Sequence, residues 1–246
     1  SMAELPGRIG IGHVRYSTAG GKGATALRDV QPFLADLAMG SMALAHKGLE
    51  YKSMPAPFTA IPRVEEGATK TVPLIRDGDR LVSDSFDIAL YLEETYPDRP
   101  TLFGGDGGKA MARFVERWSQ LTIHSYLGAA VLMDIHDCLD AEDKAHFRRT
   151  REQRFGRPIE EVPAGREEKL AAFRASLEPL RSTLSVQPFI GGQSPLFCDY
   201  IVFGAFQWAR IVSSYQPLAD DDPVRDWFER CLHLHDGLGA KVSAAA

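Results

Sequence analysis

The segment Lys70–Asp98 constrains the fold more than any other stretch, because three elements follow one another in it. Two short runs rich in aliphatic residues, Thr71–Ile75 and Arg80–Ser83, flank the sequence RDGD. An Asp-Gly pair between two such runs predicts a tight β-hairpin turn. The next stretch, DSFDIALYLEETYP, predicts a helix, because its apolar residues recur at i, i+3 and i+4 and Pro97 follows its end. The chain therefore contains a hairpin that leads directly into a helix.

The chain divides into two zones at the Pro/Gly-rich stretch 98–108. Short apolar runs and many turn residues precede this stretch, whereas apolar residues at helical spacing follow it. Asp222 and Pro223 form a typical helix start, with the aspartate as N-cap and the proline at the first helical position. We predict a mixed α/β domain over residues 1–102 and an all-helical domain over residues 109–246.

Composition excludes several classes of protein. The 246 residues are 44% hydrophobic and 25% charged, as in a globular domain, and the net charge of −5 gives no reason to expect a nucleic-acid partner. The three cysteines Cys138, Cys198 and Cys231 are far apart and form no disulfide framework, so we expect a cytoplasmic protein. The most apolar stretch, Phe197–Val212, contains charged residues, and we interpret it as a buried helix with no membrane contact.

The segment KTVPLIRDGDRLVSDSFDIALYLEETYPDRP resembles the glutathione S-transferase family, and the resemblance extends over about residues 43–239. It implies a thioredoxin-like α/β N-terminal domain, an all-α C-terminal domain and glutathione as co-substrate. The stretches FTAIPRVEEGATKTVPLI, PFIGGQSPLFCDY and PLADDDPVRDWFERCLHLHDGLG are most similar to the bacterial glutathione-dependent β-etherases, which cleave lignin-type aryl ethers. Residues 1–42 do not fit this family and make the first domain atypical.

The resemblance assigns glutathione binding to Lys70, Val72, Pro73, Asp84 and Ser85. It implies a cis peptide before Pro73, which exposes the backbone of Val72 for strand-like pairing with the cysteinyl part of glutathione. Asp84 and Ser85 open a helix whose positive end suits the γ-glutamyl carboxylate, and Asp84 suits the ammonium group. The alternative is that Asp84 or Ser85 is only a helix cap.

The first 47 residues resemble a different family. GRIGIGHVRYSTAG, VQPF and MALAHKG, over about residues 5–47, are similar to a fragment of the glutaminase domain of amidophosphoribosyltransferase. That resemblance implies roles for Arg15 and for the Lys47-Gly48 position, where the family has asparagine in place of Lys47. Glutaminase chemistry of this type needs a cysteine thiolate at the chain start, and no cysteine precedes Cys138. We therefore do not expect glutaminase activity.

Residues 1–42, here called the foreign segment, also lack the residue that is expected to activate the glutathione thiol. The β-etherase-like transferases carry a Ser-Pro-aromatic motif at the place that corresponds to Leu34–Asp36, where this chain has no Ser, Tyr or Cys. Ser17 and Tyr16 are the catalytic candidates that remain, Gln31 is a weaker hydrogen-bond donor, and the absence of any proper activating group is the alternative.

Within the N-terminal segment, alternating apolar residues predict a strand in RIGIGHVRY. Leu34, Leu37, Met42 and Leu44 lie near helical spacing and predict a helix. We expect this helix to be shortened or broken, because its interior is weakened by a glycine and a proline, Gly40 and Pro32.

Three aromatic residues of the helical zone, Trp118, Tyr126 and Trp208, are candidates for a substrate pocket, although ordinary helical core is an equal alternative. The pair His233 and His235 suggests a metal site, but side chains at i and i+2 diverge on a helix, so we expect no metal.

Transferases begin a central helix with a Ser/Thr/Asn-x-x-Asp capping box. Here Asp199 is present, but Leu196 occupies the cap position and its side chain accepts no hydrogen bond.

These observations predict a glutathione transferase in which a thiolate attacks an electrophilic or aryl-ether carbon. The alternative is a catalytically impaired glutathione-binding module of the same fold. The expected partners are a small-molecule electrophile and a second copy of the chain in a homodimer.

Overall fold

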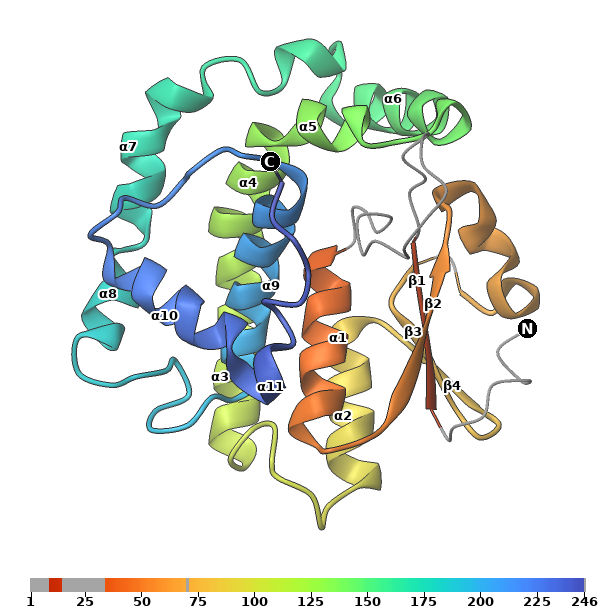
Figure 1. Ribbon diagram of the computed structural model, residues 1–246, viewed down its shortest axis with the longest axis vertical. Helices are drawn as coiled ribbons and strands as arrows, with labels where there is room; N and C mark the ends of the chain where they lie inside the picture. Colours follow the sequence, from red (N-terminus) through yellow and green to blue (C-terminus); the bar gives the residue numbers. More distant parts are fainter. Residues whose placement is uncertain (1–8, 15–33, 70, 246) are drawn as a thin grey trace.

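The computed structural model describes residues 9–14, 34–69 and 71–245 of the chain. Figure 1 shows a small β-sheet, two helices beside it, and a larger group of helices beyond them. This arrangement confirms the predicted fold class, a thioredoxin-like α/β domain joined to an all-α domain.

The sheet has the strand order β2-β1-β3-β4, with β1 at Ile9–Val14, β2 at Tyr51–Ala56, β3 at Leu74–Asp77 and β4 at Arg80–Ser83. β1 runs parallel to β2 and antiparallel to β3. A parallel pair needs a crossover connection, and the helix α1 (Leu34–His46) lies within it. The predicted strand of the N-terminal segment is confirmed at Ile9–Val14.

The predicted hairpin is confirmed, with its turn one residue later than expected. Asp77 still pairs with Arg80, so the turn consists of Gly78 and Asp79. Gly78 has φ of 58°, a left-handed conformation that glycine adopts at no steric cost. The helix α2 (Ser85–Thr95) begins two residues after β4 and confirms the predicted hairpin–helix unit.

The helix α1 lies against α2 and the central helix of the second domain, α9 (Phe197–Val212). Over its described residues it continues unbroken from Leu34 through Gly40, so a broken helix is excluded there, whereas a shortened helix stays a prediction because the residues before Leu34 lie outside the described part of the chain. Its buried residues Met42, Ala43 and Leu44 show why it is unbroken: apolar packing compensates for the weak helix propensity of a glycine.

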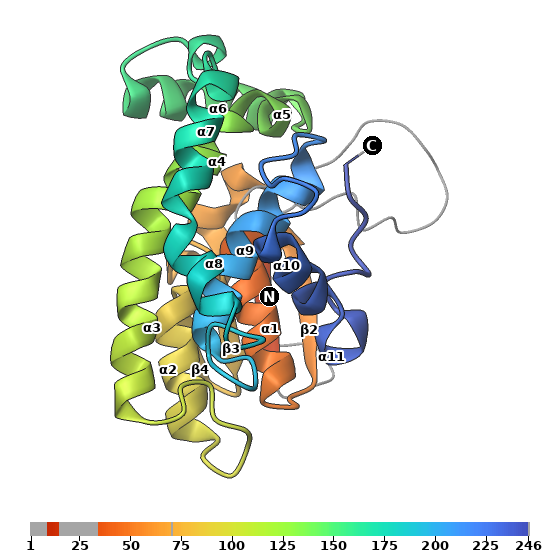
Figure 2. The same cartoon turned by 90° about the vertical axis from the view of Figure 1, so that its left-hand side faces the viewer.

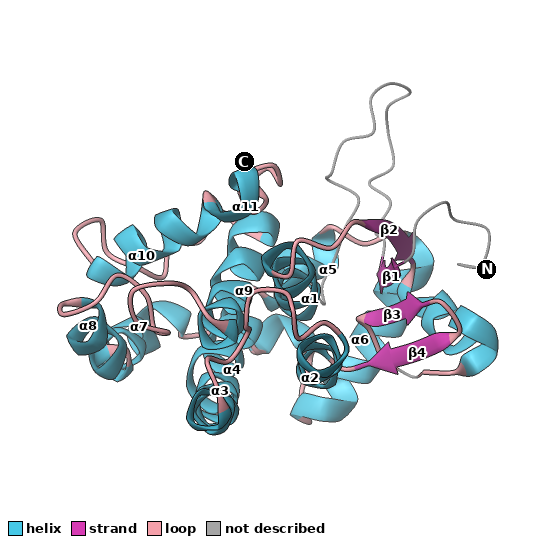
Figure 3. Cartoon of the chain, turned by 90° about the horizontal axis from the view of Figure 1, so that it is seen from below, coloured by secondary structure: helices cyan, strands magenta, loops and turns pink. Residues whose placement is uncertain are grey.

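The segment η2 (Phe58–Gly67) is a 3₁₀ segment interrupted at Val64–Glu66, and it contacts β1 and β2. In the view of Figure 3 it lies on the side of the sheet away from α1 and α2. The buried carboxylate of Asp143, on a helix of the second domain, accepts hydrogen bonds from the backbone N–H groups of Phe58 (3.3 Å) and Thr59 (3.2 Å). The two domains are thus joined by polar contacts as well as by packing.

The second domain is helical over its described residues, and α9 lies in its centre. Figure 3 shows α9 between α3 on one side and α10 and α11 on the other. The helical stretch after residue 165 is divided in two at Leu177, whose φ of −84° and ψ of 0° depart from helical values. None of the helices in the described part of the chain is long and apolar enough to cross a membrane. The remaining elements are α3 (Asp106–Ser119), the π-helix η3 (Gln120–His124), α4 (Ser125–Ala130), α5 (Leu132–Asp137), α6 (Ala141–Phe155), η4 (Ile159–Glu161), α7 (Arg166–Ser176), α8 (Glu178–Leu184), α10 (Pro223–Leu232) and α11 (Leu234–Gly237).

The start of α9 depends on one buried carboxylate. Asp199 accepts hydrogen bonds from the backbone N–H groups of Ile190 (2.7 Å), Gly191 (2.9 Å) and Leu196 (3.0 Å), and from Nε1 of Trp227 (2.9 Å). The side chain of Leu196 makes no cap bond, as predicted. Asp199 therefore supplies one half of a capping box and also fixes the loop that precedes the helix.

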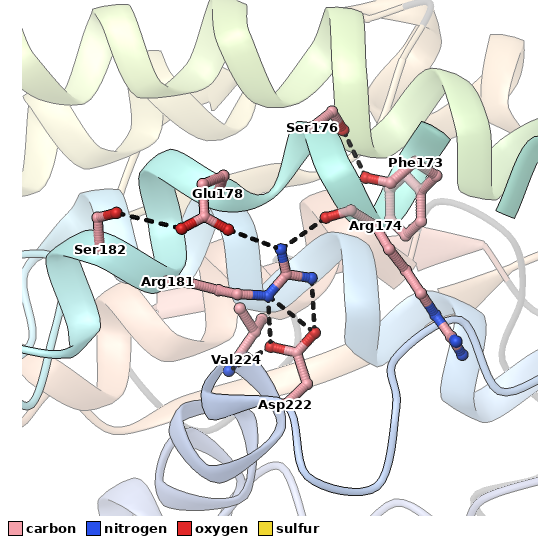
Figure 4. Close-up of polar contacts among 8 residues, drawn as sticks. All are labelled: Phe173, Arg174, Ser176, Glu178, Arg181, Ser182, Asp222 and Val224. Carbon is pink, nitrogen blue, oxygen red and sulfur yellow. Dashed lines mark hydrogen bonds and ion pairs between the residues drawn. The ribbon is translucent and has the colours of Figure 1, made fainter. Parts of the chain in front are cut away.

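A second buried carboxylate joins α8 to α10. Asp222 caps α10 by accepting from the backbone N–H of Val224 (3.0 Å), and it receives Nη2 of Arg181 at 2.8 Å (Figure 4). The predicted N-cap at Asp222 is confirmed. Arg181 also donates to the carbonyl oxygen of Arg174 at 2.7 Å, so it connects three segments of the domain.

Two neighbouring residues at the end of α1 make polar contacts, Lys47 within the first domain and His46 across to the second. Lys47 is 1% exposed and its Nζ lies 2.6 Å from Oε2 of Glu93, on α2. His46 contacts the hydroxyl of Tyr200, on α9, at 2.6 Å and the carbonyl oxygen of Thr101 at 2.9 Å. The resemblance to amidophosphoribosyltransferase implies a functional role for the Lys47 position. In this fold Lys47 is instead buried and forms an ion pair with Glu93.

Candidate functional site

The catalytic candidates Tyr16 and Ser17, and the proposed glutathione ligand Lys70, lie outside the described residues. Their roles stay predictions. The other predicted site residues fall into two groups, one at the end of the β3–β4 hairpin and one among the helices of the second domain.

The hairpin brings Val72, Pro73, Asp84 and Ser85 together. Leu74 is paired with Ser83, so the two dipeptides extend from the same end of the hairpin. Val72 and Pro73 directly precede the last pair of this ladder, and Asp84 and Ser85 directly follow it. The peptide between Val72 and Pro73 is cis, as the resemblance implies.

Val72 is 3% exposed, yet its amide N–H and carbonyl oxygen have no hydrogen-bond partner among the described residues. Buried backbone groups are almost always paired in folded proteins. The backbone of Val72 is therefore suited to accept an external partner in the manner of an added strand.

Asp84 has the unusual backbone angles φ 76° and ψ 130°. Its Oδ1 accepts hydrogen bonds from the backbone N–H groups of Phe86 (2.8 Å) and Asp87 (3.3 Å), so the cap role that the sequence left open is confirmed. Its Oδ2 has no partner in the described part of the chain, and the side chain is exposed. Ser85 is buried at the first position of α2. One carboxylate oxygen and the positive end of a helix thus lie at the same end of the hairpin as Val72.

The three aromatic candidates lie on three different helical segments: Trp118 on α3, Tyr126 on α4 and Trp208 on α9. All are half-buried and pack against the core. A Cβ atom on Gly128, in α4, would lie 3.2 Å from Cη2 of Trp208, so the glycine leaves room for this ring. Nε1 of Trp208 is buried and has no hydrogen-bond partner among the described residues. Their role in a substrate pocket stays a prediction.

Tyr126 is held by its hydroxyl and by its ring. The hydroxyl donates to the carbonyl oxygen of Arg166 at 3.0 Å, so the hydroxyl of Tyr215, at 2.7 Å, must donate to Tyr126. The ring is stacked on Phe173 with a centroid distance of 4.1 Å. Burial raises the pKa of Tyr126, which keeps the hydroxyl protonated. Tyr126 is therefore a neutral hydrogen-bonding residue and is unsuited to act as a base.

Sequence reasoning missed the partners of Tyr126. The guanidinium of Arg166 lies 4.4 Å from the ring centroid of Tyr215, on the segment that follows α9. Arg166 and Tyr215 are 40 and 89 residues from Tyr126, and no periodicity relates such distant positions.

Sequence reasoning also missed the π-helix between Trp118 and Tyr126. π segments within helices are frequent at functional sites. In this one, Nδ1 of His124 lies 3.1 Å from Oγ of Ser119, and burial lowers the pKa of the histidine.

His233 and His235 lie in different surroundings. His233 is exposed, whereas Nε2 of His235 lies 2.9 Å from the hydroxyl of Tyr200. Among the described residues, no group of three or more His, Cys, Asp and Glu side chains is arranged to hold a metal ion.

Relatives from two different families match this chain. Over 55 residues the chain is 54% identical to amidophosphoribosyltransferase 3 of Arabidopsis thaliana, which corresponds to 22% of this chain and 10% of that protein. The chain thus spans about a tenth of that relative. It is 29% identical over 198 residues to a glutathione S-transferase-like protein of Aspergillus flavus, covering 68% of this chain and 71% of the relative.

Solved structures share the fold of the whole chain. A glutathione transferase of Phanerochaete chrysosporium has a TM-score of 0.70 at 23% identity and covers 97% of this chain and 98% of its own. A glutathione S-transferase of Ceriporiopsis subvermispora, solved in complex with glutathione, has a TM-score of 0.69 at 22% identity and covers 96% of each chain.

The family comparison covers both domains in order. The N-terminal domain of glutathione S-transferase matches residues 40–100, and the C-terminal domain matches residues 110–233. The match begins at residue 40, close to the end of the atypical segment 1–42, and leaves residues 1–39 out. The chain belongs to the glutathione S-transferase family, whose co-substrate is glutathione.

Proposed function

We propose that this protein binds glutathione at the open end of the β3–β4 hairpin and joins the glutathione sulfur to a carbon atom of a small electrophile, in particular an aryl ether. Bound glutathione supplies a thiolate sulfur that forms a bond to the electrophilic carbon, while the leaving group departs with the bonding electron pair and takes up a proton. The chain's own contribution is to bind the peptide, orient it and stabilise the thiolate.

The observation that carries the proposal is the backbone of Val72, which has no hydrogen-bond partner among the described residues and lies at the same end of the hairpin as the start of α2. A buried N–H and carbonyl pair without a partner fits the peptide group of a cysteinyl residue, which offers the complementary acceptor and donor. Asp84 keeps one carboxylate oxygen for the helix and leaves the other for an ammonium group. The helix start at Ser85 favours a carboxylate nearby. Lys70 remains a proposed further ligand.

Two substitutions test this assignment by calorimetric titration with glutathione. Asp84→Asn keeps an oxygen for the cap of α2 but removes the negative charge, and Ser85→Ala removes a hydroxyl. We expect the double variant to bind glutathione at least about tenfold more weakly, about 1.4 kcal/mol, because charge-assisted hydrogen bonds are lost.

Asp87→Asn is the matched control, because Asp87 is an exposed acidic residue in the first turn of the same helix. We expect its affinity for glutathione to stay within about twofold of the original value. An unchanged affinity in the double variant, or an equal loss in the control, would contradict the assignment.

For the electrophile, we propose a pocket that includes Trp118, Tyr126 and Trp208. The buried Nε1–H of Trp208 has no partner in the described residues and is available to an ether or phenol oxygen. Stacking on Phe173 and hydrogen bonds fix the side chain of Tyr126, which lies on α4 directly after the π-helix η3. An aromatic substrate suits such walls, since flat rings pack well against tryptophan and tyrosine. The β-etherase resemblance supports the choice of an aryl ether.

The alternative function, a glutathione-binding module with impaired catalysis, is favoured by the lack of a Ser-Pro-aromatic motif at Leu34–Asp36. Turnover of glutathione with an electrophilic aryl halide, compared with the affinity for glutathione alone, separates the two functions. Tight binding without turnover supports the module, and turnover supports the enzyme, with Ser17 or Tyr16 as the first residue to substitute.

We also propose a homodimer that uses one face of α3 and η3. Met111, Phe114 and Leu121 are 55%, 66% and 78% exposed, and their spacing places them along one side of the helix with Trp118. A second copy would cover this apolar stripe, which is costly to leave in water. Sedimentation velocity measures the mass, and a stable monomer at micromolar concentration would contradict the proposal.

A further inference from the structure

A cavity of about 210 Å³ lies at the C-terminal end of α9, apart from the hairpin site. Its walls come from α9, the segment that follows it, α10 and the chain after α11, and none of the described residues of the thioredoxin-like domain lines it. The chain after α11 returns to the end of α9 (Figure 1 and Figure 2), where the backbone N–H of Ala245 donates to the carbonyl oxygen of Arg210 at 3.0 Å. The lining residues used below are Phe206, Arg210, Tyr215, Arg225, Phe228 and Glu229.

Arg210 brings to this cavity a charge that has no ion-pair partner among the described residues. The side chain is half-buried, and its Nη1 donates to two uncharged oxygens, the carbonyl of Val242 (2.8 Å) and Oε1 of Gln207 (3.4 Å). No carboxylate lies within 4.0 Å of this guanidinium in the described part of the chain, and its Nε and Nη2 have no hydrogen-bond partner there. Burial lowers the pKa of Arg210, which shows that the charge is partly desolvated. A partly desolvated guanidinium with unused donors attracts a carboxylate strongly.

The walls of the cavity are aromatic and fixed in place. The rings of Phe206 and Phe228 meet edge to face with a centroid distance of 6.2 Å. Tyr215 is fixed by its hydroxyl bond to Tyr126 at 2.7 Å and by the guanidinium of Arg166, 4.4 Å from its ring centroid. Fixed aromatic walls beside a cation suit a planar ring that carries a negative charge.

The other charges at the cavity define which anion fits. Arg225 is paired with Asp220, so its charge is largely compensated. Glu229 is exposed, forms no ion pair among the described residues, and raises the pKa of Arg210 through its charge. A carboxylate on the same wall repels a second negative charge, so the cavity favours a monoanion over a dianion.

We propose that this cavity is a second ligand site, which binds a small aromatic monocarboxylate with its carboxylate on Arg210 and its ring against Phe206, Tyr215 and Phe228. The volume of about 210 Å³ is below the ~300–1,000 Å³ of pockets for drug-sized ligands, which restricts the ligand to a single substituted ring. The hydroxyl bond between Tyr215 and Tyr126 joins this site to α4, the helix segment that carries part of the proposed electrophile pocket.

Benzoate is the probe, and ligand-observed NMR or calorimetry measures its dissociation constant with the full chain. We expect Arg210→Gln to weaken benzoate binding at least about tenfold, since a charge-assisted bidentate contact is lost. Glu229→Gln should strengthen binding by about twofold or more, because it removes a like charge. Arg225→Gln is the matched control on the same wall and should change the affinity by less than about threefold. Benzamide, which has the same shape and no charge, should bind at least about tenfold more weakly than benzoate.

Arg210→Gln also removes the contact to Val242 and so affects the chain after α11. Ala244→Phe therefore serves as a second variant: it leaves Arg210 in place and fills the cavity from an exposed lining position. It too should abolish benzoate binding while the affinity for glutathione is retained. Equal binding of benzoate and benzamide, normal binding by both variants, or loss of benzoate binding on adding glutathione would overturn the proposal.

Discussion

Acidification should weaken the junction between the two domains through the cluster of His46, Tyr200 and His235. The carbonyl oxygen of Thr101 only accepts hydrogen bonds, so Nε2 of His46 carries the proton and its Nδ1 accepts from the hydroxyl of Tyr200. That hydroxyl in turn accepts from Nε2 of His235 at 2.9 Å. The chain of hydrogen bonds is therefore complete with neutral His46, and a second proton on Nδ1 would meet the donor of Tyr200.

The size of the expected loss of stability follows from the pKa of His235. Burial and, secondarily, the neighbouring His46 lower the pKa of His235 from 6.5 to about 4, while Asp236 opposes the change. The unfolded chain takes up this proton below pH 6.5 and the folded chain only near pH 4, so the free energy of unfolding falls as the pH falls through this window and is unaffected above it.

The difference between the pKa values of His235 in the unfolded and folded chain corresponds to ~3.4 kcal/mol, because each pKa unit is worth 1.36 kcal/mol. His235 is only half-buried and solvent screens the charge, so we expect about 1–2 kcal/mol. The pKa of His46 is also lowered, chiefly by burial and further by Lys47, while the Thr101 carbonyl and Glu93 raise it, and the net effect adds in the same direction.

Urea unfolding at a series of pH values between the two pKa values measures this effect. His235→Asn removes the titrating ring, and asparagine tolerates the left-handed backbone at this position, where φ is 51°. His233→Asn is the matched control, because His233 is exposed two residues earlier. The free-energy difference between the original protein and the His235 variant should shrink as the pH falls, and that of the control should not. A difference that is constant across the window would refute the reasoning.

Three further predictions concern stability and turnover. Asp222→Ala should lower the free energy of unfolding by about 2–3 kcal/mol in urea unfolding, because it removes the cap of α10 and the buried partner of Arg181, which keeps only the exposed Glu178. Asp220→Ala removes a 99% exposed partner and should cost less than about 1 kcal/mol, and equal costs would contradict this. Trp208→Phe should lower kcat/KM for an aryl ether about fivefold or more without changing the affinity for glutathione, and unchanged kinetics would remove the indole N–H from the pocket. Replacing residues 3–42 with a family-typical strand, Ser-Pro loop and helix should raise kcat/KM with glutathione and an aryl electrophile on the order of a hundredfold, whereas equal rates would show that the present segment contains an adequate thiol activator.

The local elements could be predicted because short-range physics determines them. The Asp-Gly turn, the apolar spacing after Asp84 and the Asp222-Pro223 start all rest on interactions within a few residues. The same local rules misjudged Gly40, since they consider helix propensity and not the packing of the neighbouring buried side chains. The hairpin–helix unit could also be predicted, and its tight turn brings the segments of Val72 and Asp84 to the same end of the hairpin.

The sequence by itself determined the family, the order of the domains and the residues at the end of the hairpin, since these depend on motifs whose members are close in the chain. The tertiary structure alone decided that Tyr126 meets Tyr215, that Lys47 is buried against Glu93, and that Arg210 lines a cavity without an ion-pair partner in the described part of the chain. These contacts join residues brought together by the packing of helices across the whole chain. Sequence spacing carries no information about such pairs, because their separation in space is fixed by the burial of other side chains.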